Sequence, residues 1–155
     1  ENKNIASVDP FNPSARYVKI TGSGYGNLNL LEVQIFDLDG VNKALSTSGA
    51  SASASSTYLW SGSTPCHASI AIDSYTEEQA GIPCDGNFHT NAEMNPWLLV
   101  DLGATVKINN IVIWNRVVCC TENLSGATVS LLDENSFVVS EVDLGDTTNM
   151  RTVEL

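Results

Sequence analysis

The sequence predicts an antiparallel all-β sandwich or barrel. Apolar residues either alternate with polar ones or form short β-branched runs, and Gly, Asn, Asp and Ser bound each run. No stretch shows the 3.6-residue apolar period of an amphipathic helix. The strands are expected at residues 16–20, 31–38, 97–103, 107–115, 127–133 and 137–144.

The first two strands are too few to fold alone, since an isolated two-stranded ribbon is marginal in water. The Ser/Ala-rich residues 46–56 that follow them resemble a flexible linker, which would divide the chain. We expect instead that both strands join the later ones in one sheet system. Residues 46–56 are then a low-complexity connection or a poor edge strand.

Between this segment and the third strand, the only hint of helix is at residues 75–81, where Thr76 and Gln79 are placed to cap one short turn. Loops are therefore expected to carry the function.

Length and charge limit the function classes. The 155 residues suit one domain with its own core, and 43% hydrophobic content excludes a disordered chain. A net charge of −11 repels nucleic-acid phosphates and anionic lipid surfaces. No apolar run approaches the roughly 20 residues of a membrane helix, so we expect neither nucleic-acid binding nor membrane insertion.

Four cysteines and one glycosylation sequon, Asn123-Leu124-Ser125, indicate a secreted, extracellular protein. Neighbouring ligands at Cys66 and His67 suit a tetrahedral zinc ion poorly, so a disulfide between Cys66 and Cys84 is preferred. Four cysteines allow three connectivities. Cys119 and Cys120 would point to opposite faces of a strand and bond elsewhere, or would bond to each other.

Catalysis is not expected. Every cysteine has a disulfide alternative, which weakens a Cys–His nucleophile pair. The 18 acidic residues offer many carboxylate pairs, but no motif singles one out.

Several blocks resemble F-type lectins (fucolectins), within the wider discoidin or coagulation factor 5/8 type C group. The blocks are "NPWLLVDLGATVKINNIVIWNRVVCC", "YVKITGSGYGNLNLLEVQIFD", "VNKALSTSGASASASSTY" and "ASIAIDS". The resemblance implies an eight-stranded jelly-roll β-sandwich with sugar-binding loops at one end. Their order is permuted: residues 16–39 resemble the family's closing strands and residues 40–142 the remainder, within one domain spanning 1–155.

The resemblance also implies a sugar pocket. His89 and Arg116 match the family's His and first Arg, including the 27-residue interval between them. Asn123 stands in place of the second Arg, and Val118 replaces the Asp that orients the pocket. Two arginines and an imidazole supply hydrogen bonds to sugar hydroxyls, so losing one arginine removes donors.

In the same family, adjacent cysteines bond to each other and form a rigid apolar platform beneath the sugar, which assigns that bond to Cys119 and Cys120. Trp60 and Phe88 lie in flanking loops and are candidates to cover an apolar sugar face.

A structural calcium ion is the cofactor that the resemblance implies. Asp73 and Glu32 match its carboxylate ligands, and hard oxygen donors of this kind suit calcium. The remaining positions, which would give carbonyl or amide oxygens, are Ile70, Tyr75, Leu31 and Asn87.

Two functions follow as hypotheses. The first is a non-catalytic, calcium-stabilised extracellular module that binds fucose- or galactose-type sugars on glycans or glycoproteins. The alternative is a structural or adhesive block of an extracellular assembly, glycosylated at Asn123, with a vestigial pocket and with copies of itself or other extracellular proteins as partners.

Overall fold

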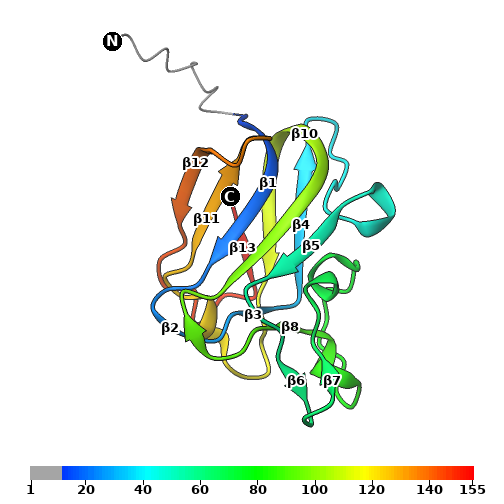
Figure 1. Cartoon of the computed structure of the whole chain (residues 1–155), viewed down its shortest axis with the longest axis vertical. Helices are drawn as coiled ribbons and strands as arrows, with labels where there is room; N and C mark the ends of the chain where they lie inside the picture. The colour runs from blue at the N-terminus through cyan, green and yellow to red at the C-terminus, as the bar shows by residue number, and fades with distance from the viewer. Residues whose placement is uncertain (1–11) are drawn as a thin grey trace.

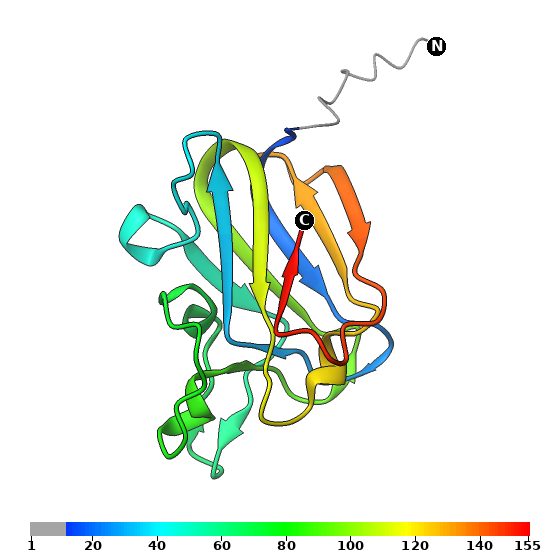
Figure 2. The ribbon, with the colours of Figure 1, turned by 180° about the vertical axis from the view of Figure 1, so that it is seen from behind.

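A computed structural model describes residues 12–155 and shows a β-sandwich of two layers (Figures 1 and 2). The long strands are β1 (Ser14–Thr21), β4 (Glu32–Asp37), β5 (Ser51–Ala54), β10 (Trp97–Trp114), β11 (Thr128–Leu132), β12 (Val138–Asp143) and β13 (Thr152–Glu154). The short strands are β2 (Tyr25–Gly26), β3 (Asn29–Leu30), β6 (Leu59–Trp60), β7 (Thr64–Pro65), β8 (Phe88–His89) and β9 (Glu93–Met94). Four 3₁₀-helices complete the set: η1 (Ser46–Ser48), η2 (Ala68–Ile72), η3 (Pro83–Gly86) and η4 (Thr121–Leu124).

The larger layer has the strand order β12-β11-β1-β10-β5, and all its pairings are antiparallel. Strand β1 lies between β10 and β11, so a strand from the start of the chain sits inside a sheet built mainly by later ones. Its alternation explains this place, because Val18 and Ile20 are buried in the core while Lys19 faces outward. The sequence prediction of an antiparallel jelly-roll sandwich is confirmed.

Strand β10 belongs to both layers. Its first part pairs with β1 and β5, and its last residues pair with β4 and β13 (Figure 2). We expected two separate strands at 97–103 and 107–115, and this was wrong. The chain stays extended through a bulge, where residues 102–105 face only Arg16 of β1. Gly103 takes a φ of +78° there, which a side chain would strain.

The Ser/Ala-rich residues form η1 and then β5, an edge strand on β10, so the second of the two expected alternatives holds. The helical turn expected at residues 75–81 is absent, and the 3₁₀-helices lie before and after it. Strand β13 is too short to have shown a pattern.

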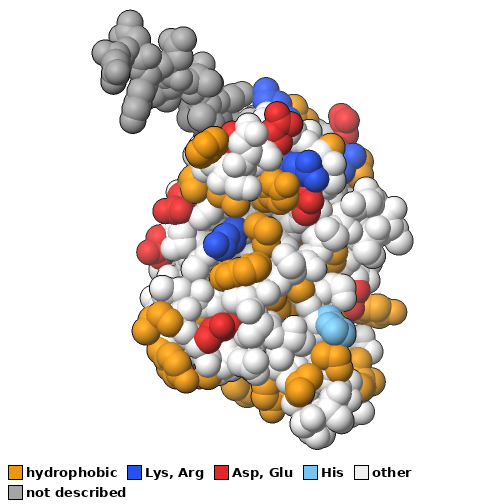
Figure 3. All heavy atoms as spheres, in the orientation of Figure 1, with side chains coloured by type: hydrophobic (Ala, Val, Ile, Leu, Met, Phe, Trp, Pro, Cys, Tyr) orange, Lys and Arg blue, Asp and Glu red, His pale blue; other side chains and the backbone are white. Residues whose placement is uncertain are grey.

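Apolar side chains from both layers form one core, which includes Val18, Ile35, Leu98, Ile113 and Val129. Among residues 12–155 there is no helix of the length and apolarity required to cross a membrane. Figure 3 shows the outer face of the larger sheet, on which charged side chains are scattered and hydrophobic ones gather at the end that carries β2, β6 and β7.

That end of the sandwich is built from loops. The two-stranded pairs β2–β9, β3–β8 and β6–β7 lie there, together with η3 and η4 (Figure 1). Backbone hydrogen bonds tie the loops to one another, as from the Tyr58 amide to the His89 carbonyl at 2.9 Å. This loop end contains the residues that the sequence singled out as a sugar pocket.

Candidate functional site

His89 is half-buried on β8, and its ring is fixed by two neighbours. Its Nδ1 lies 2.6 Å from the carbonyl oxygen of Thr90. A carbonyl only accepts, so Nδ1 carries the proton and Nε2 is left as an acceptor in the neutral ring. Burial lowers the pKa of His89, and the positive charge of Arg116 lowers it further, against the hydrogen bond to Thr90. The structure therefore brings His89 near Arg116 and favours its neutral form.

Phe88, which we expected to face a sugar, lies fully buried in the core. This expectation was wrong because successive residues of a strand point to opposite sides, and His89 takes the outward one. The aromatic ring beside His89 belongs to Tyr58, with ring centroids 4.7 Å apart. Trp60 is half-buried in the β6–β7 hairpin, opposite Thr64.

Arg116 follows the end of β10 and is anchored by its neighbour Asn115. The Asn115 side chain is fully buried and its amide donates to the carbonyls of Thr121 at 3.0 Å and Met150 at 3.2 Å. These bonds hold two loops around the strand end. The direction in which Arg116 leaves β10 is thus set by a buried polar anchor.

The guanidinium of Arg116 faces two carboxylates that sequence reasoning missed. Glu78 Oε1 lies 3.2 Å from Arg116 Nε, and Asp85 Oδ2 lies 3.7 Å from Nη2. Glu78 and Arg116 are both nearly buried, with side chains 6% and 12% exposed. The acidic pair Glu77–Glu78 between the expected calcium carboxylate and His89 was the available signal, but nothing local fixes the path of that loop.

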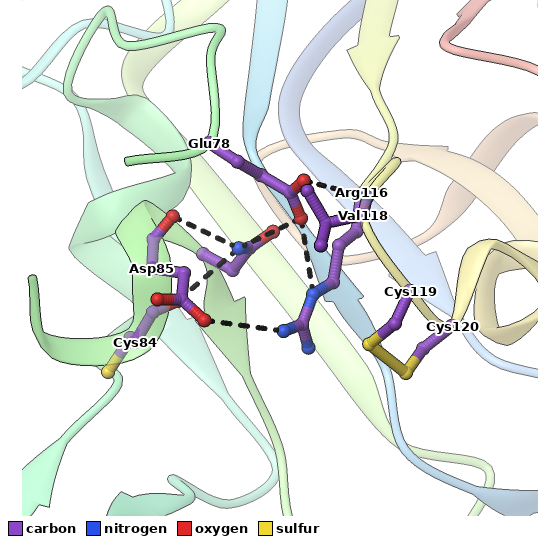
Figure 4. Close-up of a disulfide and its surroundings, with 8 residues drawn as sticks. Glu78, Cys84, Asp85, Arg116, Val118, Cys119 and Cys120 are labelled. Carbon is purple, nitrogen blue, oxygen red and sulfur yellow. Dashed lines mark hydrogen bonds and ion pairs between the residues drawn. A yellow bond between two sulfur atoms is a disulfide. The ribbon is translucent and has the colours of Figure 1, made fainter. Parts of the chain in front are cut away.

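The disulfide between Cys119 and Cys120 lies beside this group, and the Arg116 guanidinium sits between it and Asp85 (Figure 4). Cys119 is exposed, which leaves the bridge open to solvent at the loop end. The second disulfide joins Cys66 and Cys84 and holds η3 against β7. Both pairings are those that the sequence analysis preferred, so no zinc ligand set is left at Cys66.

Asn123 lies farther along, in η4, where its amide donates to the Cys120 carbonyl at 3.1 Å. Its side chain lines a hollow of about 140 Å³ together with Ser23, Tyr25 and Pro96. Val118 is 79% exposed. The backbone N–H of Val118 donates to Glu78 Oε2 at 2.7 Å, so position 118 lies beside the carboxylate that holds Arg116.

Glu32 and Asp73 form a second cluster. The Glu32 carboxylate is fully buried and accepts hydrogen bonds from the amides of Asp73 at 3.0 Å and Ser74 at 3.1 Å. Burial raises the pKa of Glu32 from 4.5 to about 8, and the charge of Asp73 adds to the rise. Burial also raises the pKa of Asp73. Glu32 is buried, Asp73 is partly buried, and neither carboxylate forms an ion pair with a cationic side chain in the described part of the chain. A bound cation relieves such an environment.

The other expected calcium ligands are arranged around this cluster in part. Ile70 is in η2, which is directly followed by Asp73, and Leu31 directly precedes Glu32. The Tyr75 amide donates to Asp73 Oδ1 at 3.0 Å. Asn87 lies instead beside Glu78 and η3, where its Oδ1 is buried without a hydrogen-bond partner. Within residues 12–155 no cluster of three or more His, Cys, Asp or Glu side chains suits a metal.

Comparisons with known proteins agree with this architecture. Residues 71–155, more than half of the chain, match the family described as NedA-like, galactose-binding domain. Fucolectin-6 of Anguilla japonica is 36% identical over 69 residues, which are 44% of this chain and 36% of the eel protein. Fucolectin of Anguilla anguilla is 38% identical over 53 residues, covering 30% of this chain and 34% of that protein.

The pentraxin fusion protein of Xenopus laevis is 33% identical over 43 residues, or 28% of this chain and 10% of that protein. The chain thus spans about a third or less of each of these relatives. A search of solved structures gave no significant match. The matched residues include the end of η2, all of β10 and the segment with Arg116 and the paired cysteines. On the strength of this match, the chain belongs to the NedA-like, galactose-binding domain family.

Proposed function

We propose that the protein is a non-catalytic, lectin-like module that binds a fucose- or galactose-type sugar at the end of the sandwich formed by His89, Arg116 and the Cys119–Cys120 disulfide. The observation that carries this proposal is the proximity of His89, a hydrogen-bond acceptor, to Arg116, a hydrogen-bond donor. Neutral His89 offers Nε2 as an acceptor, while Arg116 offers the N–H groups that its carboxylate partners leave free. Sugar hydroxyls both donate and accept, so they satisfy the two groups together.

Apolar surface beside these polar groups supports the same ligand class. The exposed Cys119–Cys120 bridge lies next to Arg116, and the Tyr58 ring, 38% exposed, packs on His89. A sugar presents hydroxyls along its edge and C–H groups on its face, and an aromatic ring or a sulfur surface packs against the latter. The fucolectin relatives support a sugar of this type.

A structural calcium ion is part of the proposal. Buried Glu32 and partly buried Asp73 supply hard carboxylate oxygens, and the chain around them supplies carbonyls. When bound, the ion supplies positive charge that favours both carboxylates in their ionised form. The role of these residues is to fix η2 and the start of β4, on which the loop end rests.

We place the protein outside the cell, where its two disulfides persist and where glycans are its partners. The proximity of the two ends of the described chain supports the expected permutation, because a permuted order is tolerated when the ends of a domain lie close together. Pro13 and Leu155 line the same cavity of about 170 Å³.

The test is a glycan array probed with the wild-type protein and with His89→Ala. We expect the wild type to bind glycans with terminal fucose or galactose and His89→Ala to lose the signal. His67→Ala is the matched control, because that histidine is exposed on the neighbouring segment. No binding of the wild type to any fucosylated or galactosylated glycan would contradict the proposal.

Two observations favour the alternative, a glycosylated structural block with a vestigial pocket. Arg116 already has two carboxylate partners, and Asn123 belongs to a sequon. Intact-mass measurement of the secreted protein before and after deglycosylation tests it. A glycan on Asn123 together with an empty array would favour the structural block.

A further inference from the structure

We propose that Glu78 is a positioning residue that supplies, from a different loop, the carboxylate that position 118 lacks. The inference rests on the proposed sugar-binding function and names the group that orients Arg116 in it. Val118 stands where the lectin pattern has an Asp, so the sequence alone leaves Arg116 without its orienting acid.

The geometry is that of a bridge. Glu78 Oε1 lies 3.2 Å from Arg116 Nε, and Glu78 Oε2 accepts the backbone N–H of Val118 at 2.7 Å (Figure 4). One carboxylate thus holds both the Arg116 side chain and the backbone of the segment that leads to Cys119. A side chain that only neutralised the arginine would not need the second bond.

Glu78 is itself held in place. Its side chain is 6% exposed, and the amide of buried Asn87 lies 3.5 Å from Oε1. The same amide reaches the carbonyls of Cys84 and Asp85, both at 3.3 Å. Cys84 and Asp85 have positive φ values of 62° and 50°, which are uncommon for residues other than glycine, and the Cys66–Cys84 disulfide fixes this turn.

Glu77 provides the contrast within the same loop. Its side chain is 72% exposed and pairs with Arg151, whose guanidinium also packs on the Trp114 ring. The two adjacent glutamates therefore differ in burial and in partner: Glu77 is exposed and pairs with Arg151, whereas Glu78 is nearly buried and pairs with Arg116. Of these two glutamates, Glu78 is the one that contacts Arg116.

The bridge decides which donors of Arg116 are free. Nε is taken by Glu78 and Nη2 faces Asp85, so the other terminal N–H groups are the ones left for a ligand. Two carboxylates against one guanidinium also leave no excess positive charge. The site should therefore take neutral sugars and repel sialylated or sulfated ones.

The experiment measures binding of the sugar identified on the array by four proteins: wild type, Glu78→Ala, Glu77→Ala and the double variant Glu78→Ala/Val118→Asp. We expect Glu78→Ala to weaken binding at least about tenfold and Glu77→Ala to stay within about twofold. The double variant restores the carboxylate at position 118 and should recover most of the affinity. Unchanged affinity in Glu78→Ala, or no recovery in the double variant, would overturn the inference.

A second measurement separates this inference from the proposed function. Hydrogen exchange of the Val118 amide and of the Arg116 Nε–H is read by NMR without any ligand. Glu78→Ala should speed both exchanges, and Val118→Asp should slow that of Arg116 Nε–H again. If the wild type binds no sugar, the proposed function fails, while these exchange rates still decide whether Glu78 holds Arg116; equal rates in all four proteins would show that it does not.

Discussion

Glu32 and Asp73 are 41 positions apart, yet the Glu32 carboxylate accepts the backbone amide of Asp73 at 3.0 Å in a fully buried place. The pair joins β4 to the end of η2, on which the loops of the candidate site rest. Burial raises the pKa of both acids, that of Glu32 to about 8. Stability should therefore depend on pH at this point, and on the calcium ion that we propose for it.

Without calcium, stability should fall as pH rises from about 4.5 to about 8. The pKa of Glu32 is 4.5 in the unfolded chain and about 8 in the folded protein, so the folded state binds the proton more tightly in that window. Thermal unfolding in a chelator, scanned across pH, measures the slope. Glu32→Gln should flatten it, and an equal slope in that variant would contradict the assignment to Glu32.

The proposed calcium ion should raise the melting temperature, because a ligand that binds only the folded state stabilises that state. At a free ion concentration about a hundredfold above its Kd, the gain is about 2.7 kcal/mol, or roughly 5 to 10 °C for a chain of this size. Calorimetry at pH 7.5 with calcium, magnesium or chelator measures the shift. Asp73→Asn should abolish it and Glu77→Gln should not; a calcium shift that persists in Asp73→Asn would rule out this site.

Phe88 and Tyr58 should respond in opposite ways to substitution. Phe88→Ala removes a fully buried ring and should cost about 3 to 5 kcal/mol of unfolding free energy. Tyr58→Ala removes a partly exposed ring beside His89 and should weaken sugar binding with a smaller loss of stability. Denaturant unfolding and calorimetric titration of both variants check this. Weakened binding in a stably folded Phe88→Ala, with Tyr58→Ala unaffected, would reverse the assignment.

Asn115 should matter for stability although it is polar. Its buried amide donates to the carbonyls of Thr121 and Met150, so Asn115→Ala leaves partly buried acceptors unpaired and should cost about 1 to 3 kcal/mol. Asn109→Ala is the matched control, since Asn109 is an exposed residue of β10, the strand that Asn115 directly follows. Equal urea midpoints for the two variants would mean that the anchor contributes nothing.

The fold was largely predictable, because strand alternation is a local signal. The runs that became β1, β4, β11 and β12 were each found within about two residues of their ends. The exception is β10, whose bulge at residues 102–105 separates two runs that are structurally one strand. Composition at Gly103 and its neighbours resembles a turn, and only the partners on both layers keep the chain extended.

The candidate site was predictable only where the chain keeps the lectin pattern. His89, Arg116 and the cysteine pair were singled out by the resemblance to F-type lectins. Glu78 could not be predicted, because it reaches Val118 across 40 positions through a loop whose path depends on the Cys66–Cys84 disulfide and on buried Asn87. Phe88 was misplaced because the parity of a two-residue strand is set by its partner β3, not by its own sequence.

NMR titration of the wild-type protein with free fucose and free galactose tests the central claim most directly. The account predicts that one of the two sugars shifts the Arg116 Nε–H signal and the backbone amides of Val118, Cys119 and Cys120, and that Arg116→Ala removes the effect. Arg16→Ala, which loses a similar ion pair with Asp101 on the large sheet, should titrate like the wild type. Shifts confined to another surface would contradict it. So would the absence of shifts with either sugar at concentrations well above the Kd of a weak lectin.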